Sequence, residues 1–457
     1  MIIHIKRAFA KCAHALYNGD MDIFKRLKKA INKPENGSLS KEVAKTTKEG
    51  EKVTSDKVYF DYASITPIDP TVAKKMHDFS GQFYNPSSIY SAAVKNKEAI
   101  GEARRTIATS FNVQADEIIF TGSGTEANNL AILGIFNGYT GKKTPHFIVS
   151  AIEHASILEA CHEVERLGGE VTYIAPEKNG VVDVKKIRAT LRPTTLLVSV
   201  MYANNEIGTI QPVGAIGRAV KEYREQQKEN NLKNNSGKNN HDDESEYPFF
   251  HTDASQAPNY LPIHIGHLGA DLVTLDGGKV YGPRGVGLLA CRRYVPLHPI
   301  IFGGGQERGL RAGTENVAAI VGFAQALATT EKMRDEEGKR LVELQDYFET
   351  EIKSRFPDVI IHGENSPRLP NITNICLPGL DAEFAVIKLD HVGIMASSAS
   401  ACQSNAEENF SQTVAALPDI GEFCKRSSLR FSTGRGTTKA HINALLSALD
   451  KILISKI

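Results

Sequence analysis

The chain has 457 residues, 41% hydrophobic and 23% charged, the composition of a globular protein long enough for two or three domains. Its formal net charge of +1 gives no reason to expect nucleic acid or a membrane as a partner, and no apolar run approaches the roughly 20 residues that span a bilayer. The six cysteines are scattered without a CxxC pair, which argues against a zinc ribbon or a disulfide framework and indicates a reducing cytoplasm.

Residues 1–56 differ in composition from the rest of the chain. Ile23, Leu27 and Ile31 recur at helical spacing and predict a short basic amphipathic helix, followed by a polar stretch typical of a linker. A secretory signal is not expected, because no long apolar run follows the first basic residues. We therefore expect a partly disordered N-terminal extension and leave its role open between a dispensable tail, a transit peptide and a helix that binds a membrane surface or a partner.

From Val58 onward, short apolar runs alternate with helix-like stretches. Such alternation over some two hundred residues predicts the α/β class, with a mainly parallel sheet covered by helices on both faces. We assign this sheet to a large domain, residues 57–320. The seven runs predicted as strands are 118–120, 146–150, 171–174, 196–201, 249–253, 272–275 and 286–290.

Residues 321–457 predict a smaller α+β domain. A long charged helix (331–355) precedes strands around 371–377 and a closing helix (441–454). Within the large domain, the polar low-complexity stretch 225–246 predicts a disordered insertion at the sheet end opposite the strand C-termini. This insertion should leave the active site intact, since each doubling of a loop costs only about 0.6 kcal/mol.

Asp253 and Lys279 form the most informative pair. Each closes a short apolar run, so both are expected at the C-terminal ends of buried parallel strands, where open α/β sheets bind ligands. A carboxylate and an amine in one crevice suit pyridoxal phosphate (PLP), which needs a Schiff-base lysine and an acidic partner for its pyridinium nitrogen. Taken alone, the pair could also be two unrelated strand-end residues.

Three further stretches follow predicted strand ends. Gly124 and Thr125 open a helix after a strand, where glycine and free N–H groups favour anion binding, although a simple helix-cap turn is the plainer interpretation. His154 could stack on a flat ring and transfer a proton, or be an inert loop histidine. Asn205 could donate to an anion or a phenolic oxygen.

Cys402 and Arg430 lie in the C-terminal part. Cys402 is in a small-residue stretch that predicts an exposed, mobile loop and hence a reactive thiol, whereas the other five cysteines are interpreted as structural. Arg430 could bind a carboxylate as a fork or form an ordinary surface ion pair. The Gly-rich stretch 303–314 could bind phosphate or form a subunit contact.

Together these stretches resemble the cysteine desulfurases, PLP enzymes of the class V aminotransferase group with fold type I. The resemblance runs from about Tyr59 to about Arg435, and its serine-rich cysteine loop is similar to that of the long-loop class, which passes sulfur to scaffold proteins. The motifs that carry it most closely are 204–208, 279–285, 303–314, 400–402 and 430–432.

This resemblance implies a cofactor site. Lys279 would form the Schiff base with PLP and abstract the α-proton of the substrate, while Asp253 would keep the pyridine nitrogen protonated. His154 would stack on the ring. Gln256 and Asn205 would hydrogen-bond its phenolic oxygen, and Asn205 would also help to hold the substrate.

The resemblance also implies phosphate, substrate and partner contacts. Gly124 and Thr125 would hold the cofactor phosphate, and Thr314 would reach the phosphate site of the partner subunit in a homodimer. Arg430 would bind the carboxylate of L-cysteine. Cys402 would attack the substrate sulfur, which leaves a persulfide on the enzyme and releases alanine.

Two positions depart from the family pattern. The family usually has a serine three positions before the lysine and a histidine immediately before it, but this chain has Asp276 and Gly278 there. A carboxylate beside the phosphate should weaken cofactor binding. We expect Asp276 to rotate outward and Gly278 to offer its backbone N–H instead.

The leading hypothesis is therefore a cytoplasmic PLP-dependent cysteine desulfurase that supplies sulfur for iron–sulfur clusters or tRNA thiolation through an acceptor protein, with no metal, membrane or direct nucleic-acid contact. One alternative is a related lyase that acts on selenocysteine. Cys402 on a mobile loop argues against it, because a simple lyase needs no such thiol. The other is a degenerate, non-catalytic scaffold subunit, motivated by Asp276 and Gly278.

Overall fold

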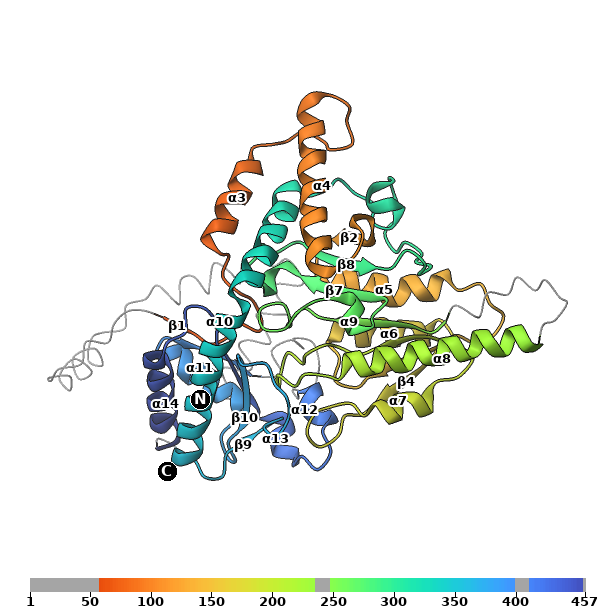
Figure 1. Cartoon of the computed structure of the whole chain (residues 1–457). Helices are drawn as coiled ribbons and strands as arrows, with labels where there is room; N and C mark the ends of the chain where they lie inside the picture. The colour runs from red at the N-terminus through yellow and green to blue at the C-terminus, as the bar shows by residue number, and fades with distance from the viewer. Residues whose placement is uncertain (1–56, 235–246, 399–410, 455–457) are drawn as a thin grey trace, which may run out of the picture. The chain divides into compact units, whose positions relative to one another are not determined.

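The computed structural model describes residues 57–234, 247–398 and 411–454 (Figure 1). The amphipathic helix expected within residues 1–56, and Cys402, lie outside these described residues. The largest sheet has seven strands in the order β2-β8-β7-β6-β5-β3-β4. Its strands are β2 (Ile118–Thr121), β3 (His146–Ser150), β4 (Glu170–Ile174), β5 (Thr195–Ser199), β6 (Phe249–Asp253), β7 (Leu272–Asp276) and β8 (Gly287–Cys291).

The predicted α/β class and mainly parallel sheet are confirmed. Strands β4, β3, β5, β6 and β7 pair in parallel, whereas β8 is antiparallel to both β7 and β2. The direction of β8 follows from its connection, since residues 277–286 are too few for the crossover helix that a parallel return needs. Each strand begins and ends within two residues of its predicted bounds.

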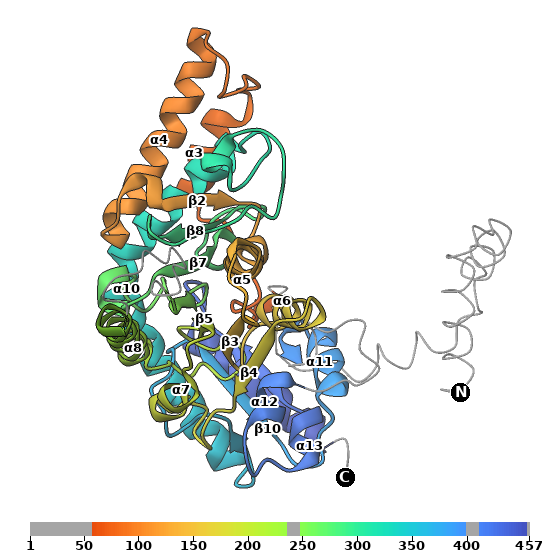
Figure 2. The same cartoon turned by 90° about the vertical axis from the view of Figure 1, so that its right-hand side faces the viewer.

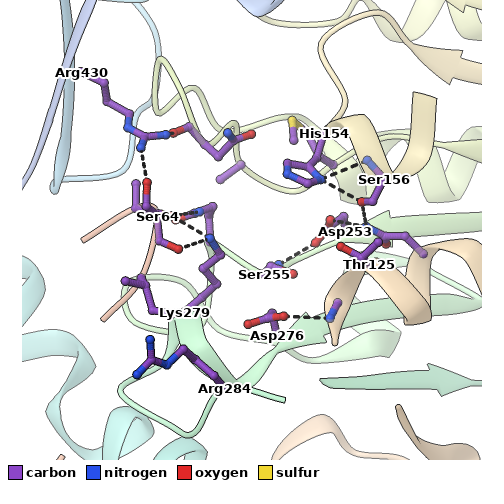
Figure 3. A pocket seen from close by; sticks show the side chains of 18 of the residues that line it. Ser64, Thr125, His154, Ser156, Asp253, Ser255, Asp276, Lys279, Arg284 and Arg430 are labelled. Atoms are coloured by element: carbon purple, nitrogen blue, oxygen red, sulfur yellow. Dashed lines mark hydrogen bonds between the residues drawn. The ribbon is translucent and has the colours of Figure 1, made fainter. Parts of the chain in front are cut away.

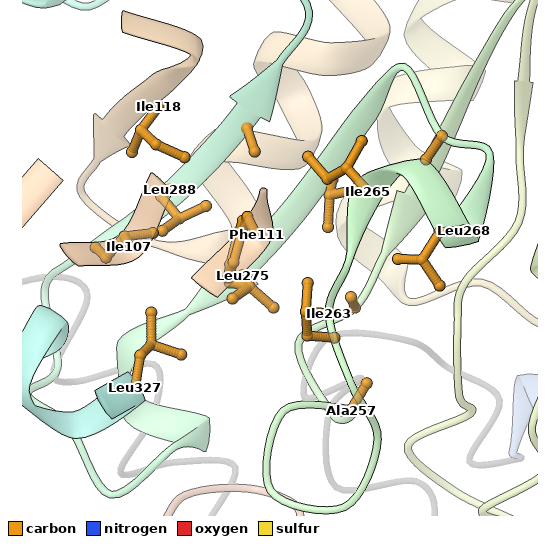
Figure 4. Close-up of a cluster of buried hydrophobic side chains, with 14 of the residues drawn as sticks. Ile107, Phe111, Ile118, Ala257, Ile263, Ile265, Leu268, Leu275, Leu288 and Leu327 are labelled. Carbon is orange, nitrogen blue, oxygen red and sulfur yellow. The ribbon is translucent and has the colours of Figure 1, made fainter. Parts of the chain in front are cut away.

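Helices cover both faces of this sheet, because strand residues alternate between two apolar clusters (Figure 2). Phe249 packs in the cluster with α5 (Gly124–Gly138) and α6 (Ala155–Arg166), whereas Phe250 packs in the opposite cluster. The helices of that opposite cluster are α3 (Pro70–Ser80), α4 (Ser91–Phe111), α7 (Val184–Thr190), α8 (Val213–Asn234), α9 (Ile265–Leu268) and the first half of α10 (Val317–Arg355). Figure 4 shows part of it, with Leu275 and Leu288 of the sheet beside Phe111 of α4.

A second, four-stranded sheet carries the C-terminal part. Its order is β12-β13-β10-β9, with β9 (Ile360–Ile361), β10 (Ile372–Cys376), β12 (Ser397–Ser398) and β13 (Leu429–Ser432). It packs in an apolar cluster with α11 (Ala382–His391), α14 (Lys439–Ile454) and the second half of α10. The remaining elements are β1 (Val58–Tyr59), paired with β11 (Ile394–Met395), the helices α12 (Gln412–Ala416) and α13 (Glu422–Arg426), and the 3-10 turns η2 (Ala115–Glu117), η4 (Gly277–Lys279) and η5 (Gln306–Gly309).

Helix α10 begins at Val317, well before the predicted start at residue 331, because its first half is apolar and buried beside α3 and α4 in the cluster on that face of the large sheet, so that no polar face marks it as a surface helix. It runs without a break across residue 320, and the described residues on both sides of that position belong to one compact unit. The division into domains 57–320 and 321–457 therefore stays a prediction.

Two expectations were wrong. The insertion 225–246 was expected to be disordered throughout, but α8 continues to Asn234, because the Glu, Gln and Lys residues of its first part are good helix formers. Residues 235–246 lie outside the described part. The cysteines were expected to form no disulfide, yet Cys376 of β10 and Cys424 of α13 are bridged, with their Cα atoms 5.5 Å apart. The fold brings together two residues 48 positions apart, which cysteine spacing alone does not reveal.

Candidate active site

A cavity of about 340 Å³ opens at the C-terminal ends of β3, β5, β6 and β7 (Figure 3). Eight of the ten site residues predicted from the sequence line it: Gly124, Thr125, His154, Asn205, Asp253, Gln256, Lys279 and Arg430. Cys402 lies outside the described residues. Thr314 is exposed and does not line the cavity of its own chain.

Sheet topology explains this convergence. The carboxyl ends of neighbouring parallel strands meet at one edge, so β6 delivers Asp253 next to β7, which leads through the 3-10 turn η4 to Lys279. Arg430 arrives from the other sheet, on β13. The site thus draws on both sheets.

The Asp253 carboxylate lies in a hydrogen-bonded wall. Its Oδ2 accepts from Asn128 Nδ2 at 2.7 Å, and its Oδ1 accepts from the backbone N–H of Ser255 at 2.9 Å. Asn128 also donates to Ser156 Oγ at 2.8 Å, and that hydroxyl lies 2.8 Å from Nδ1 of His154. These contacts fix the orientation of the carboxylate and of the imidazole together.

Burial lowers the pKa of His154. Of the nearby charges, that of Asp253 raises this pKa and that of Lys279 lowers it. The ring is therefore neutral at physiological pH, the state suited to stacking on a flat ligand. Sequence reasoning assigned no role to Asn128 or Ser156. Asn128 lies one helical turn after Gly124 on α5, and this period was the available signal.

The amine of Lys279 faces a backbone wall opposite. Its Nζ donates to the carbonyl of Ala63 at 3.0 Å and to that of Ser64, while Gln256 Nε2 donates to the same Ala63 carbonyl at 2.8 Å. These carbonyls belong to residues 61–67 (Asp-Tyr-Ala-Ser-Ile-Thr-Pro), the motif that follows β1. The amine is thereby held at the cavity surface.

Arg430 is buried, with 3% of its surface exposed, so the interpretation as a surface ion pair is wrong. Its Nη2 lies 2.7 Å from the carboxylate of Asp61 and donates to Ser64 Oγ at 2.6 Å, and its Nη1 donates to the backbone carbonyl of Asn205 at 3.0 Å. A guanidinium so oriented can bind a carboxylate in the cavity only while it also pairs with the carboxylate of Asp61.

Glu206 links this wall to α12, the first described element after residues 399–410. It is partly buried and accepts from the hydroxyls of Ser411 and, at 2.9 Å, of Thr413. Burial raises its pKa, against the lowering effect of these two hydroxyls. The sequence indicates no role for Glu206, because its partners lie some two hundred residues away.

Asp276 does not rotate outward as expected. Its Oδ2 accepts from the backbone N–H of Gly124 at 2.8 Å, and its Oδ1 accepts from that of Gly278, also at 2.8 Å. The free N–H groups at the start of a helix attract a carboxylate, and Gly278 has no side chain to displace it. The N–H that we expected Gly278 to offer is therefore used within the chain.

The donor set fits PLP. An amine, a carboxylate, a neutral imidazole and the start of α5 surround one cavity, and these are the groups that this cofactor uses. The one discordant group is Asp276, which lies at the anion-binding end. Among the described residues, no group of three or more His, Cys, Asp or Glu side chains is arranged to hold a metal ion.

Comparisons with known proteins place the chain in a family. The protein-family model described as aminotransferase class-V matches residues 58–225 and 243–445 of this chain. The chain is 39% identical to the cysteine desulfurase IscS of Dictyoglomus turgidum over 397 residues, which cover 87% of this chain and 94% of that protein. It is 36% identical to the putative cysteine desulfurase IscS 1 of Bacillus subtilis over 392 residues, 85% of this chain and 96% of that protein.

Solved structures of NifS-like proteins have the same fold as this chain. A NifS-like protein superposes with a TM-score of 0.76 at 27% identity, and a NifS-like protein from Rickettsia africae with a TM-score of 0.73 at 30% identity; each match covers 87% of this chain and 99% of the other. The chain therefore belongs to the aminotransferase class-V family, whose members are PLP-dependent enzymes. Within that family it is one of the cysteine desulfurases.

Proposed function

We propose that this PLP-dependent enzyme converts L-cysteine to L-alanine and transfers the sulfur to Cys402 as a persulfide. The observation that carries the proposal is the convergence of the Lys279 amine, the Asp253 carboxylate and the buried Arg430 guanidinium on one cavity. The relatives are cysteine desulfurases by name, and they favour neither the selenocysteine lyase nor the non-catalytic scaffold subunit.

Each residue has a proposed task. When bound, PLP supplies an electron sink for the charge left on the substrate after its α-proton departs. Lys279 Nζ holds the cofactor and moves that proton, Asp253 faces the pyridine nitrogen, and neutral His154 stacks on the ring. Gln256 and Asn205 hydrogen-bond the phenolic oxygen.

The substrate contacts complete the proposal. Arg430, with help from Asn205, binds the carboxylate of cysteine, while the start of α5, Gly124 and Thr125, binds the phosphate. The thiolate of Cys402 forms a bond to the substrate sulfur as the bond from that sulfur to Cβ breaks. The electron pair of the broken bond stays on Cβ, which takes up a proton, and the carbon skeleton leaves as alanine.

A homodimer is part of the proposal. Phe83, Ile89 and Phe302 expose 86%, 97% and 72% of their surface, and large exposed apolar side chains mark protein contacts. They lie in the connection between α3 and α4 and in the stretch before η5, and residues of both segments line one cleft. In such a dimer Thr314, exposed in its own chain, reaches the phosphate site of the partner.

The sulfur acceptor is proposed as a scaffold protein of iron–sulfur assembly or a relay protein of tRNA thiolation, in the cytoplasm. No helix among the described residues is long and apolar enough to cross a membrane. In a reducing cytoplasm the Cys376–Cys424 pair would be held as two thiols.

Purified protein, loaded with PLP and mixed with L-cysteine, tests the reaction. We expect the visible cofactor band to shift and alanine to accumulate, with sulfide released in the presence of a reductant. Cys402→Ser should retain the spectral shift but lose sulfide release. Cys161→Ala is the matched control, since Cys161 is a free cysteine buried in α6 away from the cavity. Unimpaired turnover by Cys402→Ser would contradict the persulfide assignment.

A further inference from the structure

We propose that Asp276 is a built-in occupant of the phosphate end of the site, and that it sets how tightly the cofactor binds. The inference rests on the proposed function, because it assumes that the cofactor phosphate docks at the start of α5. It concerns a position at which this chain departs from the usual family pattern.

Asp276 takes the donor that an anion would use. Gly124 is the first residue of α5, so its N–H has no partner within the helix, and Asp276 Oδ2 accepts it at 2.8 Å. The neighbouring donors are turned to other tasks: the N–H of Gly122 goes to Glu126, and that of Glu126 goes to Ser123 Oγ. The carboxylate therefore occupies the Gly124 N–H group at the cavity.

The carboxylate of Asp276 and the cofactor phosphate carry charges of the same sign. A carboxylate and a phosphate that share one donor group repel each other, so the cofactor must either displace Asp276 or bind more weakly beside it. Arg284 lines the same cavity, and no hydrogen bond or ion pair joins it to another described residue (Figure 3). Arg284 is thus a cation of the same cavity with which a displaced carboxylate can pair.

Asp276 is also coupled to Gly278 by close contact. A Cβ atom built on Gly278 would lie 3.2 Å from Asp276 Oδ1 and 3.2 Å from Cδ1 of Ile65, closer than ordinary van der Waals contact. Any side chain at position 278 thus presses on the carboxylate. The two departures from the family pattern act as one unit, in which the missing side chain makes room for Asp276.

The test measures dissociation constants of the full-length apoprotein for PLP and for pyridoxal, which lacks the phosphate. We expect Asp276→Ser and the near-isosteric Asp276→Asn to bind PLP at least about tenfold more tightly than the wild type, the scale of removing a like charge at close range. Pyridoxal affinity should change little. Glu126→Gln is the matched control, since it removes a carboxylate from the first turn of α5, close to Gly124 but outside the cavity.

A second readout is the thermal unfolding of the protein with and without PLP. In the cofactor-free protein Asp276 satisfies two backbone donors, so Asp276→Ser should lower the unfolding temperature of the apoprotein yet enlarge the rise that PLP produces. Gly278→His alone should weaken PLP binding. Combined with Asp276→Ser it should not, and this non-additivity would report the contact between the two positions.

The outcomes separate the two proposals. If Asp276→Ser and Asp276→Asn leave the ratio of PLP to pyridoxal affinity unchanged while the wild type makes alanine from cysteine, the inference is wrong and the proposed function stands. If neither the wild type nor any variant binds PLP more tightly than pyridoxal, no phosphate site exists at α5 and both fall.

Discussion

Arg430→Lys isolates the fork that we assign to the substrate carboxylate. The guanidinium contacts Asp61, Ser64 and the Asn205 carbonyl at 2.7, 2.6 and 3.0 Å. Its planar geometry can hold these groups and still offer an N–H to the substrate, which a single ammonium on a flexible stem cannot do. A hydrogen bond to a charged group contributes about 1.5–3 kcal/mol, so losing one or two should cost about 2–4 kcal/mol, roughly 30- to 1,000-fold in kcat/KM for L-cysteine.

Steady-state alanine formation measures this effect. The loss should appear mainly as a raised KM for L-cysteine, and cysteamine, which has no carboxylate, should be affected far less. Arg368→Lys is the matched control: Arg368 forms a similarly buried fork to Glu349, with contacts of 2.9 and 2.8 Å, away from the cavity. If Arg430→Lys keeps its kcat/KM within about threefold of the wild type, or if Arg368→Lys is equally impaired, the carboxylate assignment is refuted.

Two further predictions concern stability. Burial lowers the pKa of His251 and of His362 to about 4, so on acidification the unfolded chain takes up protons first. The contribution of each imidazole should be full above about pH 6.5 and fall as pH drops toward 4, by about 2 kcal/mol per group at pH 5. Burial raises the pKa of Glu153 to about 8, which changes stability in the opposite direction, so urea unfolding at pH 7.5 and 5 is compared between the wild type and His362→Asn. The same pH dependence in both proteins would contradict the prediction. Because the Cys376–Cys424 bridge closes a loop of 48 residues, Cys424→Ser or a reductant should lower the free energy of unfolding by roughly 4 kcal/mol in the chain-entropy description. Thermal unfolding of the wild type with and without reductant checks this, and superimposable curves would show that the bridge contributes nothing.

The sequence predicted the sheet well because buried parallel strands are short apolar runs bounded by turn residues, and each such run formed a strand. Site residues that follow these strands, such as His154 and Lys279, were predicted for the same reason. The strand end fixes the edge of the sheet on which each lies.

Long-range partners escaped prediction. Nothing local to Glu206 indicates Ser411, nothing near Cys376 indicates Cys424, and nothing in the 61–67 motif indicates that Asp61 pairs with Arg430. Each contact joins segments that only the complete fold brings together. The orientation of Asp276 was predicted wrongly for a different reason, since the attraction of a helix N-terminus for its carboxylate outweighed the expected rotation.

The central claim is that sulfur leaves L-cysteine by transfer to Cys402. The direct measurement is the mass of the Cys402 peptide after a single turnover of the PLP-loaded enzyme with L-cysteine, without reductant, alongside the amount of alanine. We predict one added sulfur atom on Cys402 for each alanine formed, and none on Cys161 or Cys291. Alanine formed while Cys402 keeps its unmodified mass would contradict the account.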